Sequence, residues 1–287
     1  MGKADRNRDQ SARGRIAAQQ EAARRAEARR RMLLAGAGVA VVVLVVLGIV
    51  LGKVLSNSST PSGPATEQLP ASLQTKLMNV PPSTLAAVGA GTVLQGSFKP
   101  GTGPTLTSGG KPEMLYIGAE WCPYCAADRW AMAVALSRFG TFSPLRGIHS
   151  ASNDVFPNTA TLTFFNTTYT SKYLVFTPVE NQDVNRNLLV KPTPAQQALW
   201  TKYVGGTSYP FIDIGNKLVA TATYNPQVLH GLTWSQIVSD LHDASSPVAK
   251  GAIGSANVFT AAICKLTGNM PASVCTTPPV SALEAGI

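Results

Sequence analysis

The sequence predicts an α/β domain carried behind one transmembrane helix, and three observations lead to this fold class. An apolar stretch without charged residues occupies residues 32–52. Further along, the apolar run "PEMLYIGA" (112–119) gives way, at two cysteines, to apolar residues that recur every three or four positions, a pattern typical of a buried strand followed by a helix. Finally, two short apolar runs around Gly215-Asn216 predict a strand pair.

The N-terminal 31 residues carry most of the positive charge of the chain. Residues 1–31 contain ten Lys or Arg and four Asp or Glu, which is +6 of the total net charge of +9. A basic tail often binds nucleic acid. Basic residues immediately before a membrane-spanning helix, however, keep that side of the helix in the cytoplasm. We therefore expect a basic cytoplasmic tail and no nucleic-acid partner.

The apolar stretch is long enough to cross a bilayer. At about 1.5 Å per residue, residues 32–52 cover the roughly 30 Å hydrocarbon core. A cleaved signal peptide would have a shorter apolar region followed by small residues, whereas "KVLSNSST" follows here. We expect a transmembrane anchor in the cytoplasmic membrane, with the N-terminus inside. Residues 53–68, rich in Ser, Pro and Thr, would then be a flexible linker to an outer domain at 69–287.

The two cysteines at the predicted strand–helix junction have the spacing of a redox pair. Cys122 would lie beside the free backbone N–H groups at the helix start, which favour its thiolate. Cys125 would lie one turn further on, close enough to resolve a mixed disulfide. Pro123 fits the first helical turn. This pattern predicts Cys122 as nucleophile and Cys125 as resolving thiol.

The same segment carries a family resemblance. "AEWCPYC" (119–125) resembles the active-site entry of thioredoxins, and its central Pro-Tyr pair is the one found in glutaredoxins. Thioredoxins also have a cis-proline that faces the disulfide at the start of a strand, and "YPFIDI" (209–214) supplies a match. The resemblance implies a thioredoxin-like fold, with an insertion between the active-site helix and the cis-proline strand. Substrate contacts are then expected at Trp121, Pro123, Tyr124, Tyr209 and Pro210.

More distant segments point to a narrower group. "SKYLVFTPVE" (171–180) and "ICKLTGNMPASVC" (263–275) resemble a family of membrane-anchored bacterial proteins that have a thioredoxin-like domain and no established function. One position departs from thioredoxins, because Tyr116 replaces the buried acid that precedes the first cysteine by six residues. Nearby charged residues could take over its role, but we expect surface charges or salt-bridge partners at Glu120, Asp128 and Arg129.

Other interpretations of the cysteine pair have less support. A zinc ribbon needs a second close pair of ligands, whereas the histidines are scattered at His149, His230 and His242. We therefore expect no metal and no other cofactor. A purely structural bridge between Cys122 and Cys125 remains an alternative. For Cys264 and Cys275, which flank Pro271 at the end of a predicted helix, a structural disulfide is favoured over a relay pair that exchanges electrons with the first two cysteines.

Together these features predict a membrane-anchored, extracytoplasmic thiol–disulfide oxidoreductase. Its partners would be cysteine-containing exported proteins and a membrane redox partner that recharges it. Since Pro123 and Tyr124 are uncharged, we expect a reduction potential between about −120 and −270 mV. The alternative is a non-catalytic binding module with a thioredoxin fold, tethered to the membrane for cell-envelope partners.

Overall fold

The structure is a computed structural model that describes residues 67–287. The predicted tail, the predicted anchor and most of the predicted linker lie outside the described residues. Within the described part, no helix is both long enough and apolar enough to cross a bilayer. The predicted α/β class is confirmed for this part of the chain.

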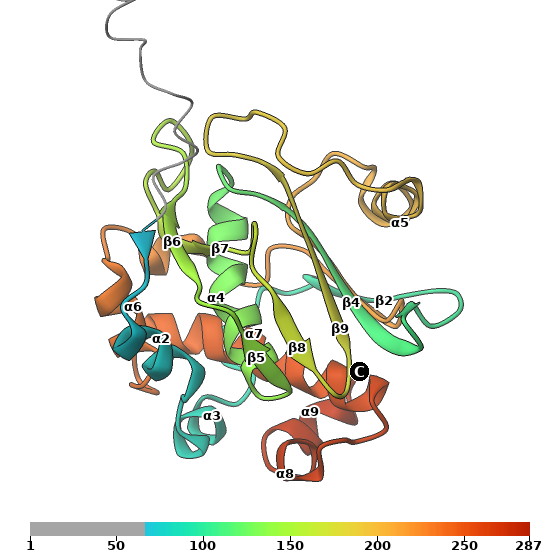
Figure 1. The fold of residues 1–287 in the computed structure, drawn as a ribbon. Coiled ribbons are helices and arrows are strands. Elements are labelled where there is room, and N and C mark those ends of the chain that lie inside the picture. Colours follow the sequence, from blue (N-terminus) through green and yellow to red (C-terminus); the bar gives the residue numbers. More distant parts are fainter. Residues whose placement is uncertain (1–66) are drawn as a thin grey trace, which may run out of the picture. The chain divides into compact units, whose positions relative to one another are not determined.

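A mixed β-sheet forms the centre of the described region (Figure 1). Its central strand is β4 (Lys111–Ala119), the predicted apolar run. β9 (Val175–Gln182) pairs with β4 in parallel, and β10 (Phe211–Ile214) pairs with its other side antiparallel. Three short strands extend the sheet by antiparallel pairing: β11 (Leu218–Ala220) on β10, β2 (Phe98–Pro100) on β11, and β3 (Thr107–Ser108) on the start of β4.

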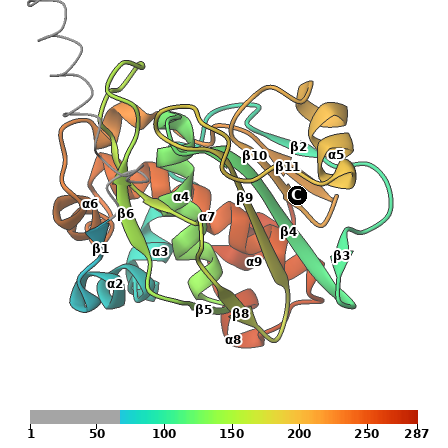
Figure 2. The same ribbon diagram turned by 45° about the horizontal axis from the view of Figure 1, so that its top comes forward.

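Both faces of β4 are buried, which explains its continuous apolar sequence. Met114 and Tyr116 point toward the large core beneath α4 (Pro123–Ser137) and α7 (Pro247–Leu266). Leu115 and Ile117 alternate with them and belong to a second cluster, which α5 covers with Trp200. Figure 2 shows α5 on the opposite side of the sheet from α4 and α7. The sheet is therefore the middle of three layers.

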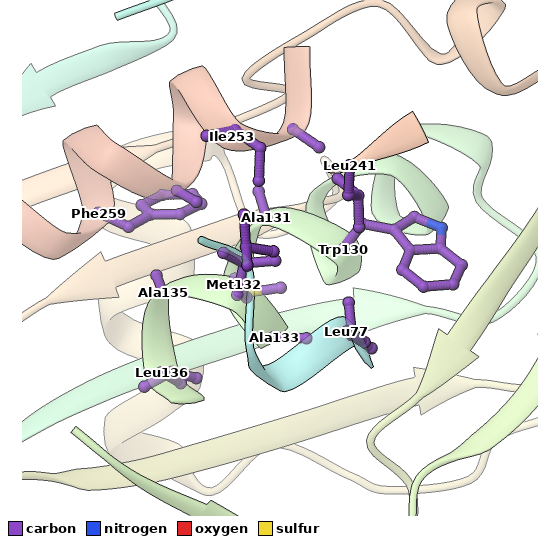
Figure 3. Packing of buried hydrophobic residues seen from close by; sticks show 14 of the residues in the cluster. Leu77, Trp130, Ala131, Met132, Ala133, Ala135, Leu136, Leu241, Ile253 and Phe259 are labelled. Atoms are coloured by element: carbon purple, nitrogen blue, oxygen red, sulfur yellow. The ribbon is translucent and has the colours of Figure 1, made fainter. Parts of the chain in front are cut away.

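The two long helices pack closely against each other. Figure 3 shows side chains of α4, among them Ala131, facing Ile253 and Phe259 of α7. Small side chains along α4 allow this close approach. On α4, the indole N–H of Trp130 also donates to the Ala160 carbonyl of β7 (Ala160–Thr163) at 3.1 Å. This packing fixes the position of α4, whose first turn carries the cysteine pair.

Four short strands lie between α4 and β9. Together with β1, which precedes α2, they form two small sheets. In one, β6 pairs with β1 and β7, and in the other, β5 pairs with β8. The segments "SPLRGIHS" (143–150) and "TATLTFFN" (159–166), whose sequences predict strands, contain β6 and β7. The bounds are β1 (Glu67–Gln68), β5 (Gly140–Phe142), β6 (Arg146–His149), β7 (Ala160–Thr163) and β8 (Tyr169–Ser171).

Helix starts follow local sequence signals. α5 (Pro194–Val204) begins after Thr193, whose hydroxyl and the side chain of Gln196 form a reciprocal capping box, and α6 begins in the same way after Thr233. The remaining helices are α2 (Ala71–Met78), α3 (Pro82–Val88), the 3₁₀ helix η1 (Pro226–Leu229), α6 (Trp234–Asp240), α8 (Ala272–Cys275) and α9 (Val280–Glu284).

A disulfide joins Cys264, in the last turns of α7, to Cys275 at the end of α8. Both cysteines are buried in the large core, whereas Cys122 and Cys125 belong to a different apolar cluster. Figure 1 shows α8 near the β5 end of α4, away from the end where α4 begins. The bridge thus ties the C-terminal segment to α7.

Replacing both Cys264 and Cys275 with alanine should lower the free energy of unfolding by about 3 kcal/mol. The bridge spans a separation of 11 residues, and opening a loop of this size restores about that much chain entropy to the unfolded state. Urea unfolding of the wild-type and the double variant would measure the difference. Equal stability of the two proteins would contradict the prediction.

Candidate active site

Cys122 and Cys125 lie where β4 ends and α4 begins. Cys122 is the N-cap residue of α4, and its sulfur accepts a hydrogen bond from the backbone N–H of Cys125 at 3.4 Å. Pro123 occupies the first helical position, where no N–H is needed. The two cysteines are 3.3 Å apart and are not bonded to each other. The strand–turn–helix geometry therefore places both sulfurs at the positive end of α4.

The two thiols have different chemical environments. The side-chain hydrogen bond from Cys125 lowers the pKa of Cys122, and backbone N–H groups of the helix start act in the same direction. Burial raises the pKa of the Cys125 thiol well above its ordinary value. Cys122 retains 4% exposure, whereas Cys125 is completely buried. Cys122 is therefore the more acidic thiol and the one with exposed surface, whereas burial favours the protonated form of Cys125.

A cis peptide bond between Tyr209 and Pro210 lies against this pair. β10 starts directly after it, and Phe211 is paired with Ile117 near the end of β4. This register brings the carbonyl of Tyr209 to 3.9 Å from the sulfur of Cys122, which donates to it. Residues 87 positions apart in sequence thus meet at the cysteine pair because β4 and β10 are neighbours.

Aromatic side chains surround the two sulfurs. Trp121, Tyr124 and Tyr209 pack on the cysteine cluster, and the rings of Trp121 and Tyr209 meet edge to face with centroids 5.8 Å apart. The indole N–H of Trp121 donates to Gln182 at 2.8 Å, and the guanidinium of Arg186 lies 3.8 Å from the centre of the Trp121 ring. The structure brings together all the substrate-contact residues expected from the sequence. It adds Gln182 and Arg186, which no sequence motif marks.

A polar hollow adjoins this aromatic rim. Its volume is about 460 Å³, and residues 149–153 line one side while residues 184–186 line the other. The backbone N–H of Ala151 donates to the Trp121 carbonyl at 3.0 Å, which joins the hollow to the cysteine turn. Arg186, which lines the hollow, also forms an ion pair with Asp154 at 3.2 Å.

Behind the cysteines lies a buried ion pair. Arg129, one helical turn after Cys125, donates through two nitrogens to both carboxylate oxygens of Glu180 on β9, at 2.8 and 2.7 Å. Nη2 of Arg129 also donates to the carbonyl of Ala119 at 2.9 Å. Both side chains have no exposed surface. Sequence reasoning did not identify Glu180, since a carboxylate within a strand carries no local signal of its partner.

The expectation that Glu120, Asp128 and Arg129 are surface charges is wrong, because all three are fully buried. The part of that expectation that made Arg129 an ion-pair partner is correct. Glu120 accepts from the hydroxyl of Thr163 at 2.5 Å, and burial raises its pKa to about 7. Asp128 accepts from the backbone N–H of Thr223 at 3.1 Å, and burial raises its pKa to about 7 as well. Two carboxyl groups that titrate near neutrality therefore lie inside the core.

The histidines do not gather at a common site. His149 packs on the ring of Trp234 with centroids 4.4 Å apart, and His242 meets the carbonyl of Lys76 at 2.9 Å. Between residues 67 and 287, no three His, Cys, Asp or Glu side chains are arranged to hold a metal ion.

One known family matches this chain. The sequence profile described as "Domain of unknown function (DUF929)" matches residues 102–265, which is more than half of the 287 residues and contains the cysteine pair and Tyr209-Pro210. No curated protein and no solved structure matches the chain significantly.

Replacing Arg129 with methionine should lower the free energy of unfolding by about 3–5 kcal/mol, because the buried charge of Glu180 loses its partner. The double variant Arg129→Met, Glu180→Gln should recover a large part of this loss, since neither charge remains. Denaturant unfolding at pH 7 would measure both. As a control, Arg186→Met removes the exposed ion pair with Asp154 and should cost no more than about 1 kcal/mol. Equal losses in the single and double variants would contradict the prediction.

Stability should fall as pH rises between about 4.5 and 7 and then level off. Burial raises the folded-state pKa values of Glu120 and Asp128, so the folded state keeps protons that the unfolded state releases in this range. Each carboxyl contributes at most about 1.4 kcal/mol per pH unit. Unfolding experiments across this range should give a smaller slope for Glu120→Gln than for the wild-type. An identical slope would show that Glu120 does not titrate there.

Proposed function

The chain belongs to the DUF929 family, whose function is unknown, and we propose that this protein is a thiol–disulfide oxidoreductase with a thioredoxin-like fold. The observation that carries the proposal is the pair of unequal thiols at the start of α4, next to the carbonyl of Tyr209. An accessible thiolate beside a buried thiol provides the two groups that disulfide exchange needs.

The topology supports the fold assignment. β4, α4 and the parallel strand β9 follow each other along the chain. The antiparallel strands β10 and β11 and the helix α7 come after them and complete the elements of the proposed thioredoxin-like fold. The cysteine pair stands between β4 and α4, and the cis-proline stands directly before β10, as the resemblance to thioredoxins implied. β5, β6, β7 and β8, between α4 and β9, would then be the expected insertion.

The exchange reaction follows from these positions. In the oxidising direction, a client thiolate attacks the sulfur of Cys122 in the Cys122–Cys125 disulfide, and Cys125 leaves as a thiolate that takes up a proton. A second client thiolate then attacks the client sulfur of the mixed disulfide, so that the client gains a disulfide and Cys122 leaves as a thiolate. Two electrons pass from the client to the protein. The reducing direction reverses both steps: the Cys122 thiolate attacks the client disulfide to form the mixed disulfide, and the Cys125 thiolate then attacks Cys122, so that the client leaves as a dithiol and the Cys122–Cys125 disulfide forms.

The cellular setting is part of the proposal. We place the cysteine domain outside the cytoplasm, anchored by residues 32–52 with the basic tail inside, and we propose exported proteins as clients and a membrane protein as redox partner. The charge pattern of the N-terminal sequence supports this orientation. The Cys264–Cys275 disulfide adds support, because such bridges persist in oxidising compartments and are rare in the cytosol.

Replacing Cys122 with serine should abolish thiol–disulfide exchange, and replacing Cys125 with serine should trap mixed disulfides on Cys122. The reason is that Cys122 is the reachable thiolate and only Cys125 lies close enough to release a bound partner. Purified full-length protein would be incubated with a disulfide-bonded peptide, quenched with acid and analysed by mass spectrometry.

The double variant Cys264→Ala, Cys275→Ala is the matched control, because it also removes two cysteines but leaves the proposed site intact. It should exchange at the wild-type rate. Wild-type protein that forms no mixed disulfide, with both serine variants behaving as it does, would reject the redox function and favour the tethered binding module.

A further inference from the structure

Tyr116 carries an unpaired hydroxyl in the core beneath the cysteine pair. It lies in the middle of β4 with no exposed surface, and its ring packs edge to face on Phe164 at 5.8 Å. The ring is thus well packed, but the hydroxyl makes no hydrogen bond of good geometry. A buried polar group without a partner is costly, and proteins rarely keep one without a use.

The neighbours of this hydroxyl are a thiol and a glycine. Burial is the largest cause of the raised pKa of Tyr116, and the nearby Cys125 thiol raises it further, although no hydrogen bond of good geometry joins the two groups. A side chain at position 118 would place its Cβ only 1.9 Å from the hydroxyl oxygen, so Gly118 leaves the space that the hydroxyl occupies. The hydroxyl therefore sits in a space kept open for it, next to the resolving thiol.

Arg129 adds a second unpaired donor to the same region. Two of its nitrogens bind Glu180 and Ala119, but the third, Nη1, is buried and has no partner among the described residues. Its guanidinium carbon lies 5.9 Å from the centre of the Tyr116 ring, and its charge acts on the Cys125 thiol. A neutral thiol is a weak acceptor, whereas a thiolate is a strong one. Burial keeps the resting Cys125 thiol protonated, and the charge of Arg129 acts against this and favours the thiolate.

We propose that the Tyr116 hydroxyl, with Arg129 beside it, stabilises negative charge on the Cys125 sulfur during the step in which Cys125 closes the disulfide. This inference rests on the proposed redox function. In that step the Cys125 thiolate attacks the sulfur of Cys122, the new disulfide forms, and the partner leaves as a thiolate. The Cys125 proton must leave before the attack, and donors already in place reduce the cost of the charge that remains. Tyr116 acts here as a positioning residue for the resolving thiol.

The test follows the two steps separately, with glutathione disulfide as the probe and reduced full-length protein as the reactant. Attack by Cys122 yields glutathione bound to Cys122 and one free glutathione, and attack by Cys125 then releases the second glutathione. Acid quenching and mass spectrometry give the amount of mixed disulfide over time. In Tyr116→Phe we expect the second step to be about three- to tenfold slower at pH 7 and to need a higher pH to reach half its maximal rate. The first step should stay within about twofold of wild-type.

Tyr224→Phe is the matched control. Its hydroxyl is also fully buried, but it donates to the carbonyl of Ala127 at 2.7 Å. Removing it should lower stability and leave both exchange steps unchanged. Tyr116→Phe should lose no stability, because the hydroxyl it removes has no partner.

Several outcomes would overturn the inference. A second step with wild-type rate and pH dependence in Tyr116→Phe would show that the hydroxyl does not act on Cys125. Equal slowing of both steps would indicate a general distortion of the site and would also reject it. In both cases the wild-type protein still exchanges, so the redox function stands. Wild-type protein that never forms a mixed disulfide would instead reject the redox function and this inference with it.

Discussion

The buried ion pair between Arg129 and Glu180 is the interaction on which the arrangement of this site depends. An isolated charge in the core would be prohibitively costly, so each side chain requires the other. Because Arg129 belongs to α4 and Glu180 to β9, their pairing fixes the helix that carries the cysteines against the strand beside β4. The same guanidinium binds the carbonyl of Ala119, which also accepts from the backbone N–H of Cys122. One charged group thus connects the sheet, the helix and the cysteine turn.

Local patterns in the sequence were sufficient to predict the elements around the site. The apolar run of β4 and the turn at Gly215-Asn216 each depend on residues within a few positions, and both occur as expected. The burial of the charged residues could not be predicted in this way. Arg129 is neutralised by a residue 51 positions away, and Asp128 finds its partner 95 positions away. Charged residues are usually on the surface, and reasoning from this general frequency led to the wrong expectation for Arg129 and Asp128.

The candidate site shows the same difference between short motifs, which the sequence reveals, and long-range contacts, which it does not. The spacing of Cys122 and Cys125 and the Tyr209-Pro210 motif were visible in the sequence because each motif is short. The surroundings of these thiols were not visible, since the sequence marks Tyr116 as a departure from thioredoxins but does not show its burial or the space beside Gly118. Sequence therefore identified the two thiols, whereas the buried polar groups around them emerged only from the three-dimensional packing.

The small exposed area of Cys122 has a consequence for the shape of any client. Displacement at sulfur requires the attacking atom to approach within about 3–3.5 Å along the line of the breaking bond. With only 4% of Cys122 exposed and aromatic rings on its border, a cysteine on a flat, rigid surface would be stopped by those rings before its sulfur arrived. A cysteine on a thin, pliable stretch of chain would fit. Under the proposed function, the aromatic rim would thus admit a cysteine on an unfolded segment and exclude one on a rigid, folded surface.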